Sequence, residues 1–246
     1  MVRIKKYIAE LLGSAMFVFF GCGAGIALGL DHKKGTGYLI TALIFGLVYF
    51  VLYVGLARVS GCHLNPVISF SMLVTKKIDI LDFVGYTIAQ IAGSFGGCGI
   101  MTYVFWGHTG NYGANSYYDA DPFNSLLIET LVTMVFVSVF LFADESDAGN
   151  VGLARSIGVM LVSLFTIHLT GGSSNPAKAL ASAVFAGGEY LSELVVFIIG
   201  AFLGAVLAWL LYLLFSTKSK SASEHDGKET EICEASEDGS EDSENC

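Results

Sequence analysis

Charged residues are scarce in this sequence. Lys, Arg, Asp and Glu make up 14% of the 246 residues, whereas hydrophobic residues make up 54%. Soluble domains usually carry about a quarter charged residues, so this composition indicates a membrane protein. Residues 216–246 hold ten of the 22 acidic and three of the 13 basic residues, which leaves residues 1–215 nearly neutral. The low and balanced charge excludes an acidic soluble protein and a nucleic-acid-binding protein.

Motifs for metal binding and covalent chemistry are also lacking. The five cysteines, at positions 22, 62, 98, 233 and 246, form no CxxC pair and have no zinc-ligand spacing. We therefore expect no disulfide framework, no metal site and no cofactor. A membrane enzyme that uses Glu10, Glu129 and the histidines is an alternative, but no HExxH or nucleophile motif supports it.

Long apolar stretches dominate what is present. A bilayer core about 30 Å thick needs roughly 20 apolar residues per helix. Six stretches have about this length, near residues 7–30, 37–57, 82–106, 123–143, 152–170 and 191–215. With both termini in the cytosol, ten of the 13 basic residues lie on the inner side, and only Lys33, Lys34 and Lys178 lie elsewhere. This asymmetry predicts six transmembrane helices with cytosolic termini.

Two further apolar stretches, at 67–74 and 177–187, are too short to span a bilayer. Each follows a non-helical run that ends in Asn-Pro, at Asn65-Pro66 and Asn175-Pro176. Asparagine is a common N-cap and proline fits the first helical position. The pattern predicts two short helices that enter the membrane from loops and turn back.

The two Asn-Pro sites belong to an internal repeat. Ser60-Gly61-Cys62-His63-Leu64-Asn65-Pro66-Val67 aligns with Thr170-Gly171-Gly172-Ser173-Ser174-Asn175-Pro176-Ala177, 110 residues later. Repeat 1 covers about residues 1–110 and repeat 2 about 123–215, each with three spans and one short helix. Because three is odd, the second repeat enters the bilayer from the opposite side, and the short helices meet near its middle.

These residues resemble the aquaporins, or major intrinsic proteins. The resemblance covers about residues 1–215 and includes Ala9-Glu10-Leu11-Leu12-Gly13, Tyr86-Thr87-Ile88-Ala89-Gln90, Glu129-Thr130 and both Asn-Pro sites. It implies an all-α membrane fold of six spans and two half-helices, assembled as a homotetramer. The sequence departs from the family at Val67, where Ala is usual, and at Lys178, where Arg is usual.

The paired Asn-Pro sites predict a barrier to protons and cations. Each half-helix directs the positive end of its dipole toward the centre. The side-chain oxygens of Asn65 and Asn175 cap these helices, and we expect each NH₂ group to remain free to donate into the pore. The constriction then comprises Asn65, Pro66, Val67, Asn175, Pro176 and Ala177. Val67 either packs behind Asn65 or narrows the pore.

The resemblance also implies a second filter formed by Phe45, Ser163, Gly172 and Lys178. Water-selective members tend to carry His in place of Ser163, and glycerol channels tend to carry Gly there, so this filter matches neither. Ser163 and Gly172 widen the opening, and the flexible lysine stem should fix the charge less rigidly than arginine does. Ala179 and Leu180 replace the Asp that commonly follows the filter arginine in glycerol facilitators.

Other polar residues have two readings each. Glu10 and Glu129 lie within spans, where they either relay protons or, as the resemblance suggests, accept hydrogen bonds from the re-entrant loops. His63 either lines the cytosolic vestibule or bonds the loop backbone. By the repeat symmetry Cys62 corresponds to Gly172, so we expect it to face the pore and to bind mercurials.

The chain is thus expected to be a passive water channel at residues 1–215, followed by a disordered acidic cytosolic tail at 216–246 with serines placed for acidophilic kinases. We expect it in the plasma membrane or in an internal, vacuolar membrane. Small neutral solutes such as glycerol, urea, ammonia or hydrogen peroxide are further expected substrates. The alternatives are a glycerol facilitator and a secondary transporter with inverted repeats.

Overall fold

The computed structural model describes residues 2–29, 37–118, 120–145, 149–172 and 174–216. The elements in these ranges are all helices: α1 (Val2–Ala27), α2 (Gly37–Ser60), α3 (Pro66–Val74), α4 (Ile80–Val104), α5 (Pro122–Ala143), α6 (Val151–Thr170), α7 (Pro176–Ala186) and α8 (Glu189–Phe215). The expected all-α fold with six long and two short helices is confirmed. The expected tail at 216–246 lies outside the described residues apart from Ser216.

Five of the long helices, α1, α2, α5, α6 and α8, are long and apolar enough to cross a membrane. The sixth, α4, has 25 residues and is not among these five. Its polar side chains Gln90 and Ser94 are fully buried, whereas Leu81 and Ile88 are 63% exposed. A helix that turns polar groups inward and apolar groups outward suits a lipid environment, so α4 completes the expected set of spans.

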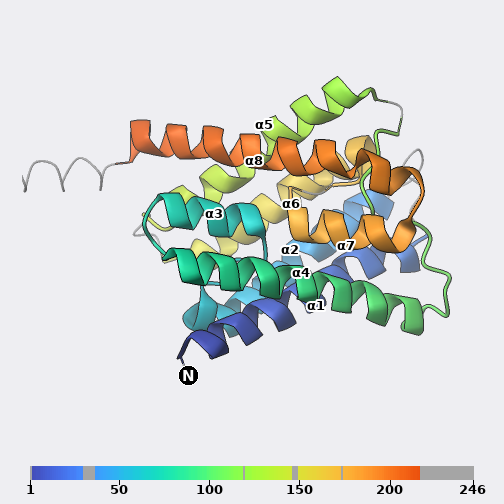
Figure 1. Cartoon of the computed structure of the whole chain (residues 1–246), viewed down its shortest axis with the longest axis horizontal. Helices are drawn as coiled ribbons and strands as arrows, with labels where there is room; N and C mark the ends of the chain where they lie inside the picture. Colours follow the sequence, from blue (N-terminus) through green and yellow to red (C-terminus); the bar gives the residue numbers. More distant parts are fainter. Residues whose placement is uncertain (1, 30–36, 119, 146–148, 173, 217–246) are drawn as a thin grey trace, which may run out of the picture.

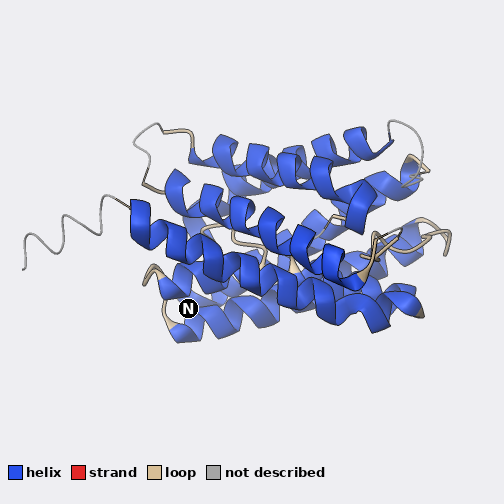
Figure 2. Cartoon of the chain, turned by 90° about the horizontal axis from the view of Figure 1, so that it is seen from above, coloured by secondary structure: helices blue, strands red, loops and turns tan. Residues whose placement is uncertain are grey.

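The helices repeat one arrangement twice. In the first half α1 packs against α4 and α2, and in the second half α5 packs against α8 and α6, while α2 and α6 join the halves. The long helices run lengthwise through the molecule, and the start of α1 and the end of α8 lie at the same end of it (Figures 1 and 2). This shared end is called the termini side below.

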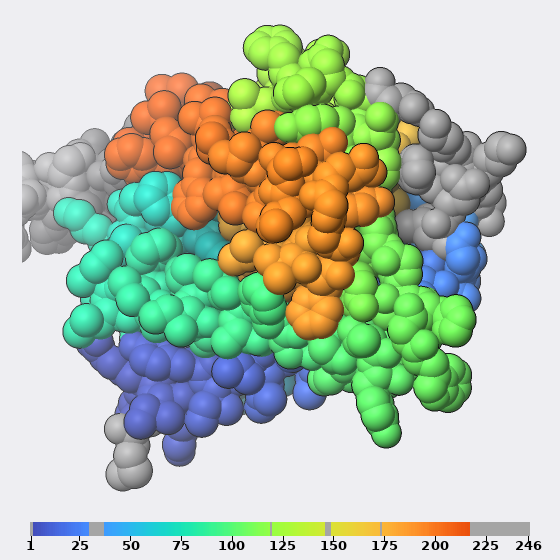
Figure 3. Space-filling model, turned by 45° about the vertical axis from the view of Figure 1, so that its right-hand side comes forward, coloured from blue at the N-terminus to red at the C-terminus, as the bar shows by residue number. Residues whose placement is uncertain are grey.

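The half-helices α3 and α7 begin near the middle of the molecule and run toward opposite ends (Figure 1). Each has proline in its first turn and asparagine as its N-cap. α3 packs against α4 and α8, and α7 packs against the same two helices. Figure 3 shows the flank on which α7 and the first part of α8, in orange, lie beside α4, in green. The long helices thus hold both N-termini at the centre.

Glycines let the helices of each half approach closely. A Cβ atom at Gly93 of α4 would lie 2.1 Å from the carbonyl oxygen of Leu11 in α1. A Cβ atom at Gly204 of α8 would lie 2.5 Å from the carbonyl oxygen of Thr130 in α5. Both contacts are with helix backbone, so a side chain at either glycine requires the helices to separate.

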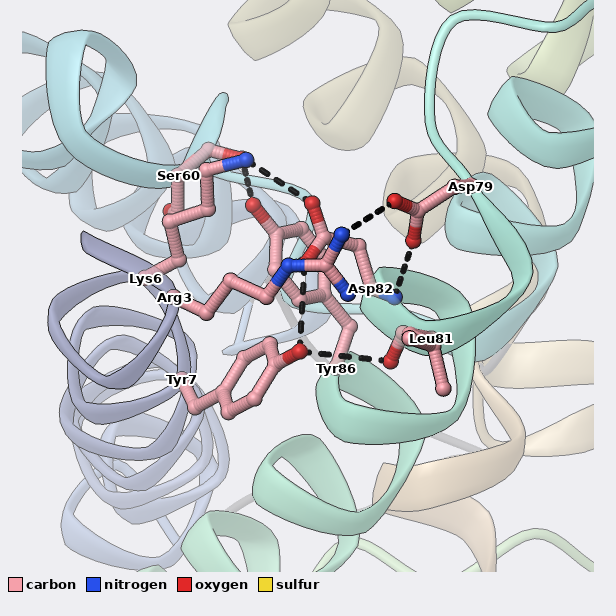
Figure 4. Close-up of polar contacts among 8 residues, drawn as sticks. All are labelled: Arg3, Lys6, Tyr7, Ser60, Asp79, Leu81, Asp82 and Tyr86. Carbon is pink, nitrogen blue, oxygen red and sulfur yellow. Dashed lines mark hydrogen bonds and ion pairs between the residues drawn. The ribbon is translucent and has the colours of Figure 1, made fainter. Parts of the chain in front are cut away.

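Charged side chains fasten α1 to α4 on the termini side (Figure 4). Arg3 donates to the Asp79 carboxylate at 2.6 Å, and Lys6 donates to that of Asp82 at 2.8 Å. The Tyr7 hydroxyl donates to the other Asp82 oxygen at 3.1 Å. Because Asp79 also caps α4 through the Asp82 N–H, the start of this helix is tied to α1.

Candidate functional site

The two asparagines cap the half-helices as the sequence predicts. The Asn65 Oδ1 atom accepts from the Val67 N–H at 3.0 Å. The Asn175 Oδ1 atom accepts from the N–H groups of Ala177 and Lys178 at 3.1 and 3.3 Å. Since proline has no N–H, these bonds involve the first amides that each half-helix presents toward the centre.

The asparagine NH₂ groups bridge the two halves. Asn65 Nδ2 donates to the Ser174 carbonyl at 2.8 Å, and Asn175 Nδ2 donates to the Leu64 carbonyl at 2.9 Å. Leu64 and Ser174 have φ values of 53° and 45°, in the left-handed region that non-glycine residues seldom occupy. The expectation that both NH₂ groups are left entirely to the pore is therefore wrong, because each uses one N–H to hold the opposite loop.

The Glu10 carboxylate supports the first loop. It accepts from the N–H groups of His63 and Leu64 at 2.9 and 2.6 Å, from the Ser60 hydroxyl at 2.6 Å and from Gln90 Nε2 at 2.8 Å. Four donors surround a fully buried carboxylate, so its lone pairs are engaged with protein groups.

Glu129 has the equivalent place in the second half. It accepts from the Thr170 hydroxyl at 2.8 Å and from the Ser174 N–H at 3.2 Å. Neither Glu129 nor Glu10 lines any of the cavities described next. This placement favours support of the loops over proton relay.

Three cavities lie in a row through the bundle. The termini-side vestibule, of about 360 Å³, is lined by residues including Lys6, Tyr53, Ser60, His63, Lys77 and Arg155. The central constriction, of about 30 Å³, is lined by residues including Phe45, His63, Asn65, Ser163, Asn175 and Lys178. The third cavity, of about 230 Å³, lies beyond the constriction from the termini side and is called the loop-side vestibule, because the α4–α5 connection helps to line it. Its lining residues include Cys22, Thr41, Phe45, His108, Asn111 and Lys178.

Shared residues connect these cavities. His63 lines both the termini-side vestibule and the constriction, and Phe45 and Lys178 line both the constriction and the loop-side vestibule. The central cavity, at the two asparagines, is the smallest of the three, and its volume of about 30 Å³ is on the scale of one water molecule.

All four residues expected in the filter, Phe45, Ser163, Gly172 and Lys178, line the constriction. Phe45 comes from α2 and packs into space left by Gly21, where a Cβ atom would lie 2.1 Å from its ring. Ser163 comes from α6, and Gly172 and Lys178 flank Asn175. The structure thus brings the four together from three segments.

Lys178 is held more rigidly than the sequence predicts. Its Nζ atom donates to the carbonyls of Gly113, Gly172 and Gly171 at 2.7, 2.9 and 3.4 Å. An ammonium group has three N–H donors, so three carbonyls engage all of them. The expectation of a loosely fixed charge is wrong, because Gly113 in the α4–α5 connection and the α6–α7 loop together hold the lysine head.

The remaining expected residues have different positions. His63 lines the cavities and also bonds the loop, with Nδ1 3.1 Å from the Ser69 hydroxyl and its N–H on Glu10. Val67 is fully buried in the core and lines none of the three cavities, which favours the packing reading.

Cys62 does not face the pore. It is fully buried, lines none of the three cavities and has a φ of 53°. Its carbonyl accepts from the Tyr49 hydroxyl at 2.8 Å. The symmetry argument from Gly172 therefore fails for the side chain. The cysteine that lines a vestibule is Cys22 of α1.

The sequence reasoning did not single out Arg155 of α6. This side chain is nearly buried, donates to the Gly61 carbonyl at 3.2 Å and pairs with Asp144. Its guanidinium lies 4.8 Å from the centre of the Phe140 ring. The sequence does contain a signal for its role, since Arg155 lies in the first turns of the expected span at 152–170. A cation inside a span needs polar partners.

Comparison with known proteins identifies the family. The major intrinsic protein family matches residues 1–212. The chain belongs to this family. Its members are channels, so the enzyme alternative is excluded. Together with the apolar helices, membership shows that the chain is an integral membrane protein.

Individual major intrinsic proteins resemble the chain over most of its length. It is 36% identical over 211 residues to the "Glycerol uptake facilitator protein-like 6" of Lactiplantibacillus plantarum, covering 83% of this chain and 95% of the relative. It is 27% identical over 227 residues to "Aquaporin Z" of Rhodopseudomonas palustris, covering 87% and 95%. The X-ray structure of the aquaglyceroporin from Plasmodium falciparum has a TM-score of 0.73 at 21% identity, covering 85% and 95%, and supports the shared fold.

Proposed function

We propose that this major intrinsic protein is a passive pore for water and for small neutral solutes of the glycerol and urea class. The observation that carries the proposal is the row of three cavities, which narrows to about 30 Å³ between the two asparagine caps. A row of cavities with so small a central volume suits the passage of small molecules one after another, whereas a transporter would hold its substrate at a central binding site.

Protons and cations are excluded by charge. The N-termini of α3 and α7 each present about half a positive elementary charge to the constriction. Lys178 adds an ammonium group on the loop side, fully buried and held on three carbonyls. In a narrow pore with low dielectric these positive groups act over short distances with little screening.

The composition of the filter supports passage of solutes larger than water. Ser163 and Gly172 occupy little volume in the wall of the constriction. The relative with 36% identity is named as a glycerol uptake facilitator-like protein, which agrees with a wider filter. The Aquaporin Z relative, at 27% identity, favours the second candidate, a channel for water alone.

Osmotic swelling of proteoliposomes in a stopped-flow instrument tests the proposal. Purified protein should raise the permeability to water, glycerol and urea above that of empty vesicles, with no proton or potassium current. Uptake should stay proportional to solute concentration and independent of an ion gradient. Selective water flow would establish the water-only candidate, whereas saturation or ion coupling would establish a transporter.

Assembly and orientation form part of the proposal. Large apolar side chains such as Val51 and Val54 on α2 are exposed along the bundle, where lipid or another subunit can cover them. By family resemblance we propose a homotetramer with one pore per subunit and cytosolic termini, in a plasma or vacuolar membrane. Mass measurement of the detergent-solubilised complex and protease access to the acidic tail in sealed vesicles test these points.

The tail at 216–246 is proposed to be dispensable for conduction, since it is highly charged and follows the second repeat. Truncation after Thr217 should leave the unit permeability unchanged in vesicles. A large loss would show that the tail gates or helps to assemble the channel.

A further inference from the structure

Three cationic side chains from separate segments meet in the termini-side vestibule. Lys6 comes from α1, Lys77 from the α3–α4 connection and Arg155 from α6, and all three line this cavity of about 360 Å³. Its lining includes the carboxylate of Asp144, which pairs with both Lys77 and Arg155. With Asp82 counted as well, because it pairs with Lys6, three cations meet two carboxylates. The cavity therefore keeps a positive charge that attracts anions.

Two of these cations have unused hydrogen-bond donors. An ammonium group carries three N–H donors. The Lys6 Nζ atom donates to Asp82 at 2.8 Å and the Lys77 Nζ atom donates to Asp144 at 3.1 Å, and neither makes a second hydrogen bond within the described ranges. The side chains of Lys6 and Lys77 are 31% and 29% exposed, so a solute can reach both. Each lysine thus has two donors left for a bound oxyanion.

The shared carboxylate shows how closely two of the cations approach. Lys77 pairs with the Oδ2 atom of Asp144, and Arg155 pairs with the Oδ1 atom. Two cations that reach one carboxylate are close enough to reach one phosphate group. A phosphate group offers more acceptor oxygens than a carboxylate and carries a charge of about −1.5 to −2 at neutral pH. A phosphate group therefore suits this set of donors better than a single carboxylate does.

The vestibule lies on the path through the bundle. His63 lines both the vestibule and the central constriction. The constriction, with a volume on the scale of one water molecule, is too small for a hydrated phosphate group. An anion bound in the vestibule therefore stays there and occupies the path of water and solute.

We propose that the termini-side vestibule binds a phosphate-bearing anion through Lys6, Lys77 and Arg155, and that the bound anion reduces flow through the pore. Inorganic phosphate, a small phosphate monoester and a lipid headgroup present the same oxygens to the site. The binding rests on the cavity and its charges alone, whereas the reduction of flow rests on the proposed channel function. With cytosolic termini, the site meets the phosphorylated solutes of the cytosol.

Calorimetric titration of the full-length protein in a neutral detergent measures binding without conduction. Inorganic phosphate and glycerol phosphate are the probes. Lys77→Gln should weaken binding about tenfold, the scale of one hydrogen bond to a charged group, and Lys6→Gln should act in the same direction. Lys76→Gln and Lys5→Gln are matched controls, since both lysines are exposed and lie outside the cavity lining, and each should bind as the wild type does. Equal weakening by Lys77→Gln and Lys76→Gln, or no binding by the wild type, would overturn the site.

Osmotic swelling of proteoliposomes made of neutral lipid tests the effect on flow. Phosphate on both sides of the membrane should lower the water permeability of the wild type more than chloride of equal ionic strength does, and the loss should be smaller in Lys77→Gln. Vesicles that contain phosphatidic acid, without soluble phosphate, form a second arm, and a loss there that depends on Lys77 identifies a lipid headgroup as the ligand.

The two measurements separate the possible failures. Phosphate binding with unchanged flow would contradict the block, and equal losses in phosphate and chloride would show charge screening in place of a bound anion. Vesicles that pass no water even without phosphate would contradict the proposed channel function instead, while calorimetry still decides the binding site. Melting temperatures in detergent show whether each variant is folded.

Discussion

The two halves of the molecule share one frame but contribute differently to the pore. In the first half Glu10 gathers four donors, one of them from Gln90 of α4. If Gly93 is aligned with Gly200, the residue of α8 that corresponds to Gln90 is Phe197, which has no donor. The first half places three rings in the constriction, those of Phe17, Phe45 and Tyr49, beside His63, whereas the second half places one phenylalanine ring, Phe136, beside Ser163, Ser174 and Lys178.

This difference shows how a repeat separates structure from selectivity. The first loop is held by a dense set of bonds to Glu10, and the neighbouring helices α1 and α2 place three rings in the constriction. In the second half Ser163 comes from α6, Ser174 from the loop and Lys178 from α7. Both halves depend on the caps of the half-helices. The two reciprocal asparagine hydrogen bonds join the halves at the level of these caps.

The largest effect is expected when the Glu10 carboxylate is altered. Glu10→Gln replaces an acceptor oxygen by an NH₂ group that faces N–H donors of the loop. We expect a loss of about 3 kcal/mol or more in the free energy of unfolding, since hydrogen bonds to charged groups contribute about 1.5–3 kcal/mol each. Glu129→Gln, with two donors among the described residues, should lose less. Thermal unfolding in detergent measures both, and equal losses would remove the proposed difference between the loops.

A smaller loss is expected at the glycine contacts, where the halves behave alike. Gly93→Ala and Gly204→Ala both drive a Cβ atom into a helix backbone and should each cost roughly 1–3 kcal/mol. Gly96→Ala in α4 is the control, because nothing lies within 4 Å of a Cβ atom there. The readout is the melting temperature of the purified protein. A variant at Gly93 as stable as that at Gly96 would contradict the close packing of α1 and α4.

The sequence could predict the frame because its signals are local or periodic. Apolar lengths give the spans, and each Asn-Pro gives a cap and a first turn. The repeat gives the inversion, and the family resemblance gives the four filter positions. The anchoring of Lys178 was not predictable, because its acceptor Gly113 lies 65 residues earlier in an irregular connection. Cys62 and its counterpart Gly172 both have left-handed φ values, of 53° and 65°, but a glycine has no side chain whose direction the symmetry could transfer to Cys62.

Filter width offers a third test of the division between halves. The double change Ser163→His with Lys178→Arg alters only second-half residues and fills the constriction with larger groups. Glycerol and urea permeabilities should fall about tenfold or more, the scale on which a site discriminates by one small group, and water permeability should fall less. Stopped-flow measurements on matched vesicles decide the point. If wild-type and double-variant vesicles reject solutes equally, Phe45 of the first half sets the selectivity instead.

The smallest effect is expected from mercurial block, where the two halves differ at equivalent positions. Gly172 lines the constriction, but its counterpart Cys62 is buried away from it. Cys22 lines the loop-side vestibule and packs against Gly113, since a Cβ atom at Gly113 would lie 2.9 Å from the Cys22 Sγ atom. A mercurial bound there should displace Gly113, whose carbonyl holds Lys178, and reduce water flow partially.

Cys22→Ser should abolish this block, whereas Cys62→Ser and Cys98→Ser should retain it, because both of these side chains are fully buried outside the three cavities. Water permeability of proteoliposomes before and after mercurial treatment, with reversal by a thiol reductant, is the measurement. Block that persists in Cys22→Ser and disappears in Cys62→Ser would show that the first loop presents its cysteine to the pore after all. The two halves would then be alike at the level of the constriction, and the division between a scaffolding half and a selecting half would have to be abandoned.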